Sequence, residues 1–453
     1  MKRVLFVIFG GTGDLARRKL LPALSKLQSD REHPIDLSII ALARRNHTSA
    51  SYLQDMEQSA TASFDLSILK DRITYFRMDA TDERAYPDLK RKVDEIADRT
   101  DLCLYYLALS PELFTEAATN LSAVKLIEKG NRQKRVLFEK PFGTDLKSAI
   151  RINQGLASVL DEEQIYRIDH YLGKEMIQNL MMVRFGNRIF EDSWNNSSIR
   201  SIHIVSKEKD GILGRGAYYD QAGALKDMVQ SHLLQMLSLV AMDVPLSYHS
   251  EDVKNEKVAV LDNLSFDPNG CYFGQYAGYR EEKNVGKDSL TETFVRLKAF
   301  VDTPRFKGIP IYLLTGKKLS RKETYIMVEF EVTSEQRKWK LPLRTNKLYI
   351  RIAPLDGVGL ALNSKVIGRR DEVEEVELDY CASCKAFGNV PEAYERLLRD
   401  AIDGHKTLFA RWDEIEKSWR HIEAIKAKQK EPFTYKDDNE LERIMKEEKE
   451  VVL

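Results

Sequence analysis

The sequence predicts an α/β Rossmann-like domain with a doubly wound parallel sheet, followed by a larger α+β domain with a mainly antiparallel sheet. A buried-strand pattern at residues 4–9 runs into a glycine-rich turn and then into leucines at helical spacing. Strand patterns and helix-length segments then alternate up to about residue 168. Beyond that point strand patterns follow one another with few helices between them, which is typical of antiparallel sheets.

Length and charge limit the class of protein. At 453 residues the chain is too long for one ordinary core, and 43% hydrophobic residues can fill more than one. Its 70 Lys and Arg residues balance 70 Asp and Glu residues, so the formal net charge is zero. No long-range field therefore favours nucleic acid or an anionic membrane, and we expect neither as a partner.

The apolar stretch at residues 4–9 ends at glycines, so it is too short for a membrane span or a secretory signal. This pattern predicts a soluble, cytoplasmic protein.

The alternating patterns divide the chain into predicted domains. We expect the Rossmann domain at residues 1–168, an α+β substrate and oligomerisation domain at 169–435, and a charged C-terminal tail at 436–453 that forms a solvated helix or a frayed end. A long helix is expected at 218–242. The strands are expected at residues 37–43, 73–76, 102–109, 135–138 and 165–168 in the first domain, and at 199–205, 291–300, 312–314, 324–331 and 347–352 in the second.

The cysteines form no disulfide framework for a chain of this size, and we expect them to be reduced. They lie at positions 103, 271, 381 and 384. Cys381 and Cys384 have the spacing of half a zinc site or of a redox pair, but no second pair of this kind exists in the sequence. We therefore predict no metal site.

A dinucleotide motif follows the first strand. The run from Gly11 to Ala16 fits GxGxxA, in which glycines let the backbone approach a pyrophosphate at a helix N-terminus. A merely tight turn is the alternative. The cofactor-binding residues predicted here are Gly10, Gly11, Thr12, Gly13, Asp14 and Leu15.

The end of the second strand indicates which dinucleotide binds. NAD enzymes usually place an acid there for the ribose hydroxyl, whereas this chain has Arg44 and Arg45. Guanidinium groups suit a 2′-phosphate, so we predict NADP, with NAD as a weaker alternative. A solvated pair of arginines remains the structural alternative.

Two polar segments follow later strands. Lys140 comes directly after the fifth strand, where ligands of open α/β sheets bind. The run Arg167-Ile168-Asp169-His170-Tyr171-Leu172-Gly173-Lys174-Glu175 lies at a strand-to-helix junction. Because Lys174 is four residues after His170, the two can share a helix face near its N-terminus and bind an anion. A capped helix start with a solvated face is the alternative.

His232 lies five residues after Asp227 in an otherwise apolar helix. A lone helical histidine is more often a satisfied core residue than a base. Glu208, Lys317 and Lys322 similarly read as surface charges when each is taken alone.

Together these segments resemble the glucose-6-phosphate dehydrogenase family. The resemblance is carried by the strings 10–16, 139–143, 167–175 and 218–232, and by Pro391-Glu392-Ala393-Tyr394-Glu395-Arg396. It implies oxidation of β-D-glucose 6-phosphate at C1 to 6-phosphoglucono-1,5-lactone with hydride transfer to NADP, the first step of the oxidative pentose phosphate pathway. It also implies a homodimer or homotetramer.

The resemblance also assigns roles to residues. His232 would be the catalytic base with Asp169 as its partner. Lys140, which would also contact the cofactor, and His170, Tyr171 and Lys174 would bind the substrate, mainly its phosphate. Glu208, Asp227, Lys317 and Lys322 would line the sugar. One departure is Ala217, where the family often has glycine.

Two rival functions remain open from the sequence. One is an NADP-dependent dehydrogenase of another sugar or sugar phosphate, and the other is a catalytically silent sugar-phosphate sensor. A silent protein is expected to lose its base, yet His232, Asp169 and Lys140 are all present.

Overall fold

The structure is a computed structural model that describes residues 1–58, 66–97, 99–369, 372–385 and 392–447. It divides into two compact units, Met1–Gly173 with Pro391–Glu416 and Lys174–Val390 with Lys417–Leu453. We describe each unit separately. Compared with the predicted domain ranges, the first change of unit comes at residue 173 instead of 168. Residues 391–416 also belong to the first unit, although they follow most of the second in sequence.

The first unit contains a six-stranded sheet in the order β3-β2-β1-β4-β5-β6. Every pair in it is parallel, which confirms the predicted parallel sheet. This order is that of a dinucleotide-binding Rossmann fold. The strands are β1 Lys2–Phe9, β2 Ile35–Ala43, β3 Ile73–Arg77, β4 Leu102–Leu107, β5 Lys134–Phe138 and β6 Ile165–Arg167.

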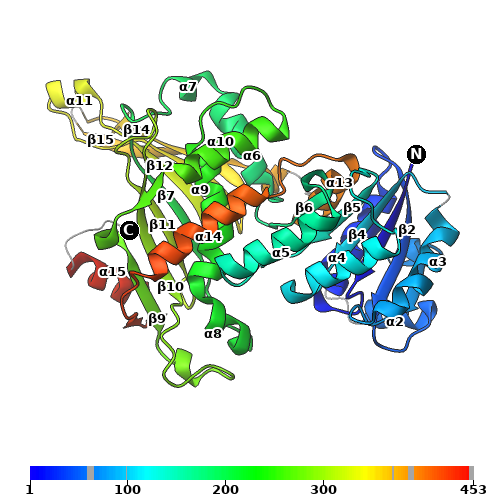
Figure 1. The fold of residues 1–453 in the computed structure, drawn as a ribbon. Coiled ribbons are helices and arrows are strands. Elements are labelled where there is room, and N and C mark those ends of the chain that lie inside the picture. Colours follow the sequence, from blue (N-terminus) through cyan, green and yellow to red (C-terminus); the bar gives the residue numbers. More distant parts are fainter. Residues whose placement is uncertain (59–65, 98, 370–371, 386–391, 448–453) are drawn as a thin grey trace. The chain divides into compact units, whose positions relative to one another are not determined.

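Helices cover both faces of this sheet, so it is doubly wound as predicted (Figure 1). The main helices are α1 Leu21–Ser29, α2 Ser49–Gln58, α3 Tyr86–Ala97, α4 Phe114–Ala123, α5 Leu146–Val159 and α13 Ala393–Asp403. Short turns of helix add η1 Ala16–Leu20, η2 Ser67–Leu69, η3 Glu83–Ala85, η4 Pro111–Leu113 and η5 Glu162–Gln164.

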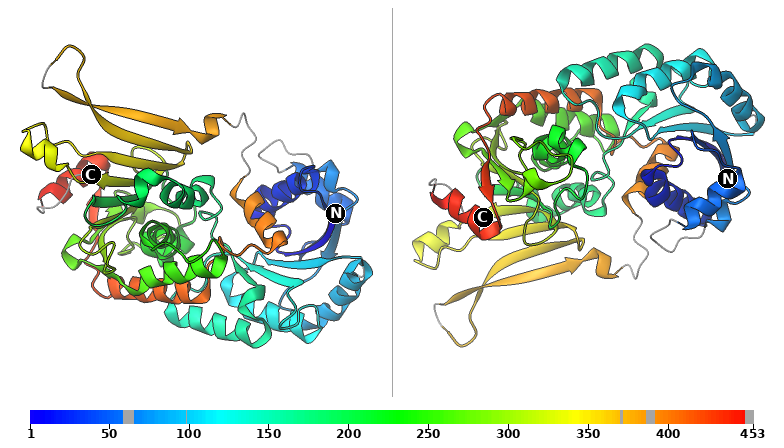
Figure 2. Two further views of the ribbon diagram at one scale, coloured as in Figure 1. Left: turned by 90° about the horizontal axis from the view of Figure 1, so that it is seen from above. Right: turned by 90° about the horizontal axis from the view of Figure 1, so that it is seen from below.

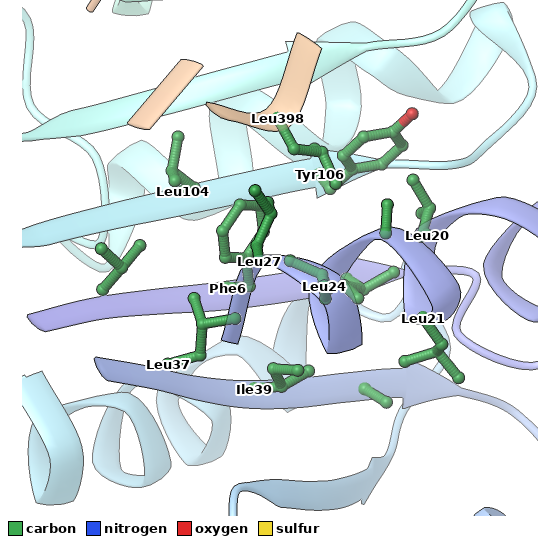
Figure 3. Packing of buried hydrophobic residues seen from close by; sticks show 14 of the residues in the cluster. Phe6, Leu20, Leu21, Leu24, Leu27, Leu37, Ile39, Leu104, Tyr106 and Leu398 are labelled. Atoms are coloured by element: carbon green, nitrogen blue, oxygen red, sulfur yellow. The ribbon is translucent and has the colours of Figure 1, made fainter. Parts of the chain in front are cut away.

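The core on one face joins α1, α2 and α13 to the central strands. Phe6 of β1 lies among leucines of α1 such as Leu24, with Leu398 of α13 packed above β4 (Figure 3). On the other face, Phe114 of α4 meets Phe138 of β5 with 5.2 Å between ring centroids. Since α13 completes this core, the late segment 391–416 is a structural part of the first unit.

The second unit contains a ten-stranded sheet in the order β15-β14-β13-β12-β7-β11-β10-β9-β16, with β8 beside β10. Its pairs are antiparallel except for β7 with β11 and β9 with β16, so the sheet is mixed but mainly antiparallel, as predicted. The strands are β7 Ile199–Lys207, β8 Leu264–Phe266, β9 Tyr272–Tyr276, β10 Phe294–Val301, β11 Ile311–Gly316, β12 Glu323–Phe330, β13 Lys347–Ala353, β14 Gly357–Lys365, β15 Val373–Cys381 and β16 Phe433–Tyr435.

One group of helices in this unit lies on one side of the sheet (Figures 1 and 2). They are α6 Glu175–Phe185, η6 Leu225–Leu233, α9 Leu234–Ala241, α10 Ser250–Asp262 and α14 Trp412–Lys426. The others are α7 Arg188–Glu191, α8 Gly216–Ala224, η7 Pro268–Gly270, η8 Tyr279–Glu281, α11 Ser334–Lys338, α12 Ala382–Lys385 and α15 Asp438–Glu447. Within the described part of the chain, no helix has the length and apolar character needed to cross a membrane.

The predicted single helix at 218–242 is wrong in one respect, because it is interrupted. Gly223, inside the last turn of α8, has the non-helical values φ +64° and ψ 176°, which kink the chain and change its direction. The chain continues as η6, a π-helix, and then as α9. The continuous apolar pattern concealed this break because each segment buries its own apolar residues.

The C-terminal segment forms a helix, α15, which was one of the two predicted alternatives, but this helix is anchored and not simply solvated. Leu441 and Met445 of α15 are buried in a cluster with Tyr276 and Tyr435. Asp438, at the start of this helix, accepts hydrogen bonds from the backbone and side chain of Ser320. The apolar residues of this charge-rich helix are enough to anchor it. Residues 448–453 lie outside the described part.

The expectation of reduced cysteines is wrong for one pair. Cys381 and Cys384 form a disulfide with 5.3 Å between their Cα atoms, because the turn from β15 into α12 brings them within bonding range. Cys103 and Cys271 are free thiols. Burial raises the pKa of both, to about 11 for Cys271, so neither is a reactive thiolate near neutral pH.

Candidate active site

The first unit brings its predicted functional segments to one edge of the parallel sheet, which we call the carboxyl edge. The strands are in register, with Phe9 opposite Leu42 and Leu107, and Phe138 opposite Arg167. Residues one or two positions past the ends of these strands therefore lie at the same edge. They are Gly10 after β1, Arg44 after β2, Lys140 after β5 and Asp169 after β6.

The glycine turn after β1 has a backbone that only glycine accommodates. Gly10 has φ +80°, and a Cβ at this position would lie 2.4 Å from the carbonyl oxygen of Ala108. The N–H of Gly13 closes the turn on the carbonyl of Gly10 at 2.9 Å. Ala16, the last position of the motif, is fully buried. The turn therefore presents backbone, not side chains, to the carboxyl edge.

A cavity of about 430 Å³ opens beside this turn. Its lining residues are Phe9, Gly10, Thr12, Gly13, Leu42, Ala43, Arg44, Arg45, Met78, Asp79, Ala80, Thr81, Ala108, Leu109 and Leu113. The turn supplies one end and the arginines after β2 supply another part. This arrangement fits a dinucleotide whose phosphates meet the backbone of the turn.

Some predicted cofactor residues do not line the cavity. Gly11 donates its N–H to Leu42 of β2 at 2.8 Å and so joins the turn to the sheet. Leu15 packs against the core, and the exposed Asp14 pairs with Arg18 at 2.8 Å. Lys140 is also absent from the lining.

The backbone carbonyls of Arg44 and Arg45 accept hydrogen bonds, and the side chains of both residues are exposed. The Tyr75 hydroxyl donates to the carbonyl of Arg45 at 2.6 Å, and Arg77 donates to that of Arg44 at 3.2 Å. The guanidinium groups are therefore available to a ligand at a place that the backbone defines.

Sequence reasoning missed Asp79 and Thr81, which line the same cavity after β3. The backbone N–H and hydroxyl of Thr81 donate to the Asp79 carboxylate and, with the nearby Arg44, lower its pKa. A short Asp-x-Thr turn directly after a strand was the available signal.

Beside Lys140, Glu139 anchors α13 to the carboxyl edge. The hydroxyls of Tyr106 and Tyr394 both donate to Glu139 Oε1, the latter at 3.1 Å. Burial nevertheless raises the pKa of Glu139. This network explains why the string around Tyr394 belongs with the motifs of the first unit. Pro391, the first residue of that string, lies outside the described residues.

The segment after β6 forms a tight turn. Asp169 is buried, and one of its carboxylate oxygens accepts the Tyr171 N–H at 2.9 Å. Gly173 packs so closely on α13 that a Cβ would lie 2.7 Å from the Ala393 carbonyl oxygen. His170 stands in this turn and α6 begins only at Glu175, so the predicted shared helix face of His170 and Lys174 is wrong.

In the second unit, Lys317 and Glu208 form an ion pair. Lys317 is buried, and its ammonium nitrogen lies 4.9 Å from the centroid of the Tyr219 ring. The pair is aligned because the N–H of Glu208, just past β7, donates to Gly316 at the end of β11. We call Glu208, Lys317 and Tyr219 the 208–317 cluster.

Asp227 lies near this cluster. Its carboxylate accepts the Tyr218 hydroxyl at 3.4 Å, and burial together with this acid raises the pKa of Tyr218 to about 12. Burial and the same acid also raise the pKa of Tyr219. Lys322 is exposed and lies just before β12, which begins at Glu323.

His232 is buried on η6, seven residues after the start of that helix at Leu225. Hydrogen bonds in a π-helix run from i to i+5, and such segments are frequent at functional sites. Asp169 belongs to the first unit and His232 to the second. Their partnership therefore remains a prediction.

Comparisons with known proteins agree with this two-part organisation. The model described as the NAD binding domain of glucose-6-phosphate dehydrogenase matches residues 7–179, and that of its C-terminal domain matches residues 181–448. The Bacillus subtilis glucose-6-phosphate 1-dehydrogenase is 37% identical over 93% of this chain and 91% of its own length. The Caenorhabditis elegans enzyme is 36% identical over 95% of this chain and 88% of its own.

Solved structures are similar over the same length. A glucose-6-phosphate dehydrogenase in complex with its substrate glucose 6-phosphate has a TM-score of 0.91 at 31% identity, covering 100% of this chain and 99% of the other. The enzyme from Mycobacterium avium has a TM-score of 0.84 at 37% identity, covering 95% and 93%. Both family models, relatives that match along nearly the whole chain and the carboxyl-edge cavity agree, and the chain belongs to the glucose-6-phosphate dehydrogenase family.

Proposed function

We propose that this chain oxidises β-D-glucose 6-phosphate at C1 to 6-phosphoglucono-1,5-lactone with NADP as the hydride acceptor. The observation that carries the proposal is the agreement with glucose-6-phosphate dehydrogenases through both units, including a relative solved with glucose 6-phosphate. We place this activity in the cytoplasm, as the sequence suggests.

The cofactor part of the proposal is supported by the cavity at the carboxyl edge. The close approach of Gly10 to Ala108 leaves no room for a side chain where a pyrophosphate would meet the turn. Arg44 and Arg45 offer charge-assisted hydrogen bonds to a 2′-phosphate, and no acid takes the ribose position directly after β2. When bound, the nicotinamide would supply hydride acceptance.

The chemical step needs a base, because hydride leaves C1 more easily when the C1 hydroxyl loses its proton. We assign this role to His232, whose imidazole accepts a proton near neutral pH. Asp169 would orient the ring and stabilise the imidazolium. Both side chains are buried, so each is protected from bulk water.

Each unit contributes its own candidate substrate-binding residues. Lys140, His170, Tyr171 and Lys174 would hold the phosphate. The 208–317 cluster offers a carboxylate and an ammonium, which can accept and donate hydrogen bonds to sugar hydroxyls. Asp227 would add a further acceptor. Lys322, which is exposed, would also contact the sugar.

The test is an absorbance assay for NADPH with purified protein. We expect reduction of NADP with glucose 6-phosphate and a lower kcat/KM with NAD. Unphosphorylated glucose should be a much poorer substrate. Absence of activity with glucose 6-phosphate and either dinucleotide would refute the proposed function, and equal use of free glucose would refute phosphate recognition.

We also propose a homodimer or homotetramer. Strand β15 ends the large sheet, and Leu378 and Tyr380 on it are 58% and 45% exposed. An exposed apolar edge strand is a ready pairing surface. Light scattering on the purified protein would measure the mass, and a monomer at micromolar concentration would contradict this assembly.

A further inference from the structure

Glu292 joins three parts of the second unit just before β10. It is only 3% exposed. Its Oε1 accepts the N–H of Leu225 at 3.0 Å, and its backbone carbonyl accepts the N–H of Ala224, also at 3.0 Å. Its Oε2 accepts the side-chain amide of Gln429 at 3.0 Å. Both carboxylate oxygens are therefore hydrogen-bonded.

The partners Ala224 and Leu225 stand where η6 begins. The first N–H groups of a helix have no partner within the helix, and a carboxylate near them is favourable because of the helix dipole. Glu292 supplies both a side-chain and a backbone acceptor at this end. It therefore determines where the helix starts and in which direction it leaves the preceding turn.

Gly223 makes this contact possible. A Cβ there would lie 2.3 Å from Glu292 Oε1, and its φ of +64° is unfavourable for other residues. The break between α8 and η6 and the contact with the buried Glu292 carboxylate therefore depend on each other. A continuous helix through 223 would place the N–H of Leu225 inside the helix, away from the carboxylate.

The start of η6 controls the direction of His232. A π-helix turns less per residue than an α-helix, because its hydrogen bonds span one residue more. If the segment reverted to α-helical pairing from Leu225, the residues toward its C-terminal end would rotate about the helix axis. His232, in the last turn, would rotate most, whereas Asp227 lies in the first turn and would rotate least.

We infer that Glu292 is a positioning residue that anchors the start of η6 and thereby aims the His232 imidazole at the substrate. The inference rests on the proposed role of His232 as base. Glu292 has no assigned contact with substrate or cofactor. It acts on the rate of proton removal through the backbone of one helix.

A cavity of about 360 Å³ borders Glu292 and is lined also by Gln221, Thr291, Lys426 and Gln429. Truncation of Glu292 opens onto this existing space instead of leaving an enclosed void, so we expect the variant to fold. Glu292→Gln is a milder change, because its amide oxygen can still accept from Leu225 and Gln429 can turn its amide to match.

The test compares Glu292→Ala, Glu292→Gln and a matched control, Asp267→Ala. The Asp267 carboxylate also accepts a backbone N–H, that of Asn269, at the start of a helix, but η7 carries no candidate residue. We expect Glu292→Ala to lower kcat about ten- to a hundredfold with KM for NADP unchanged, as a displaced catalytic group does. Glu292→Gln should recover most of the rate, and the control should be normal.

A double variant separates positioning from general destabilisation. In a His232→Asn background, Glu292→Ala should lower kcat by less than about twofold, because its route of action is already removed. A full additive loss, or a normal kcat for Glu292→Ala alone, would overturn the inference. If His232→Asn itself has normal kcat, the proposed base fails instead, and the wild-type assay tests the overall function independently.

Discussion

The two units position their candidate functional residues in different ways. In the first unit, functional residues come one or two positions after strands of one parallel sheet, whose register brings Gly10, Arg44, Lys140 and Asp169 to a common edge. In the second unit, some candidate residues lie on an interrupted helix. Others lie just past strand ends, where Glu208 and Lys317 form an ion pair with each other. The first arrangement follows from backbone topology, and the second depends on individual side-chain contacts.

This difference separates two kinds of function. Binding of a dinucleotide needs a backbone turn and a few exposed charges, which a parallel sheet offers at its carboxyl edge. Proton transfer needs one buried group at a defined angle, which in this chain depends on the anchoring of η6. We therefore expect second-unit variants to change the rate of chemistry and first-unit variants to change cofactor selection.

The largest effect is expected from His232→Asn. Loss of a general base typically lowers kcat by about 10²–10⁴, and KM for glucose 6-phosphate should stay nearly constant. Asp169→Asn should cause a smaller loss of the same kind. Steady-state kinetics would measure both, with His249→Asn, an exposed histidine just before α10, as a matched control. Near-normal kcat in His232→Asn would assign the base to another residue.

Arg44→Ala should change cofactor selection instead of chemistry. Loss of one charge-assisted hydrogen bond to a 2′-phosphate costs about 1.5–3 kcal/mol, or roughly ten- to a hundredfold in kcat/KM with NADP. Activity with NAD should change little. Arg31→Ala, another exposed arginine of the first unit, provides the control. Equal losses of kcat/KM with NADP and NAD would show that Arg44 does not bind the 2′-phosphate.

Asp400→Asn tests how the burial of one carboxyl group of α13 changes the stability of the folded protein. Burial raises the pKa of Asp400 to about 6 from its ordinary 3.8, so the folded state disfavours its charged form. Its carboxylate therefore costs stability above pH 6, and this cost falls as pH drops through 6 toward 4. We expect the variant to be about 1–3 kcal/mol more stable at pH 8, with no difference near pH 4.

Thermal unfolding monitored by circular dichroism at both pH values would measure this effect. A Tm difference that is the same at pH 8 and pH 4 would mean that the titration of Asp400 is not its source.

The smallest effect concerns Lys174, the residue that precedes α6. If its ammonium binds the substrate phosphate, Lys174→Ala should raise KM for glucose 6-phosphate about tenfold and leave activity on free glucose nearly unchanged. Lys147→Ala, an exposed lysine near the start of α5, is the matched control. A parallel loss with both sugars would make the role of Lys174 structural.

Local patterns were sufficient for the first sheet. The apolar runs at β1, β2 and β5 and the glycine turn between strand and helix predicted parallel strands with ligand-binding residues at their ends. They did not reveal Asp79 and Thr81, whose place beside Arg44 depends on the pairing of β3 with β2. Strand β15 was missed although Val376, Leu378 and Tyr380 alternate with acidic residues, and these apolar side chains are exposed in the structure.

The sequence by itself determined the fold class, the dinucleotide turn and, through its resemblance to one family, the candidate side chains. Only the tertiary structure decided that α13 returns to the first unit, that the long predicted helix breaks at Gly223, and that Glu292 caps the start of η6. The physical reason is the range of the interactions. Turns and periodic burial depend on neighbours in sequence, whereas the bond from Leu225 to Glu292 joins residues 67 positions apart, which no local pattern encodes.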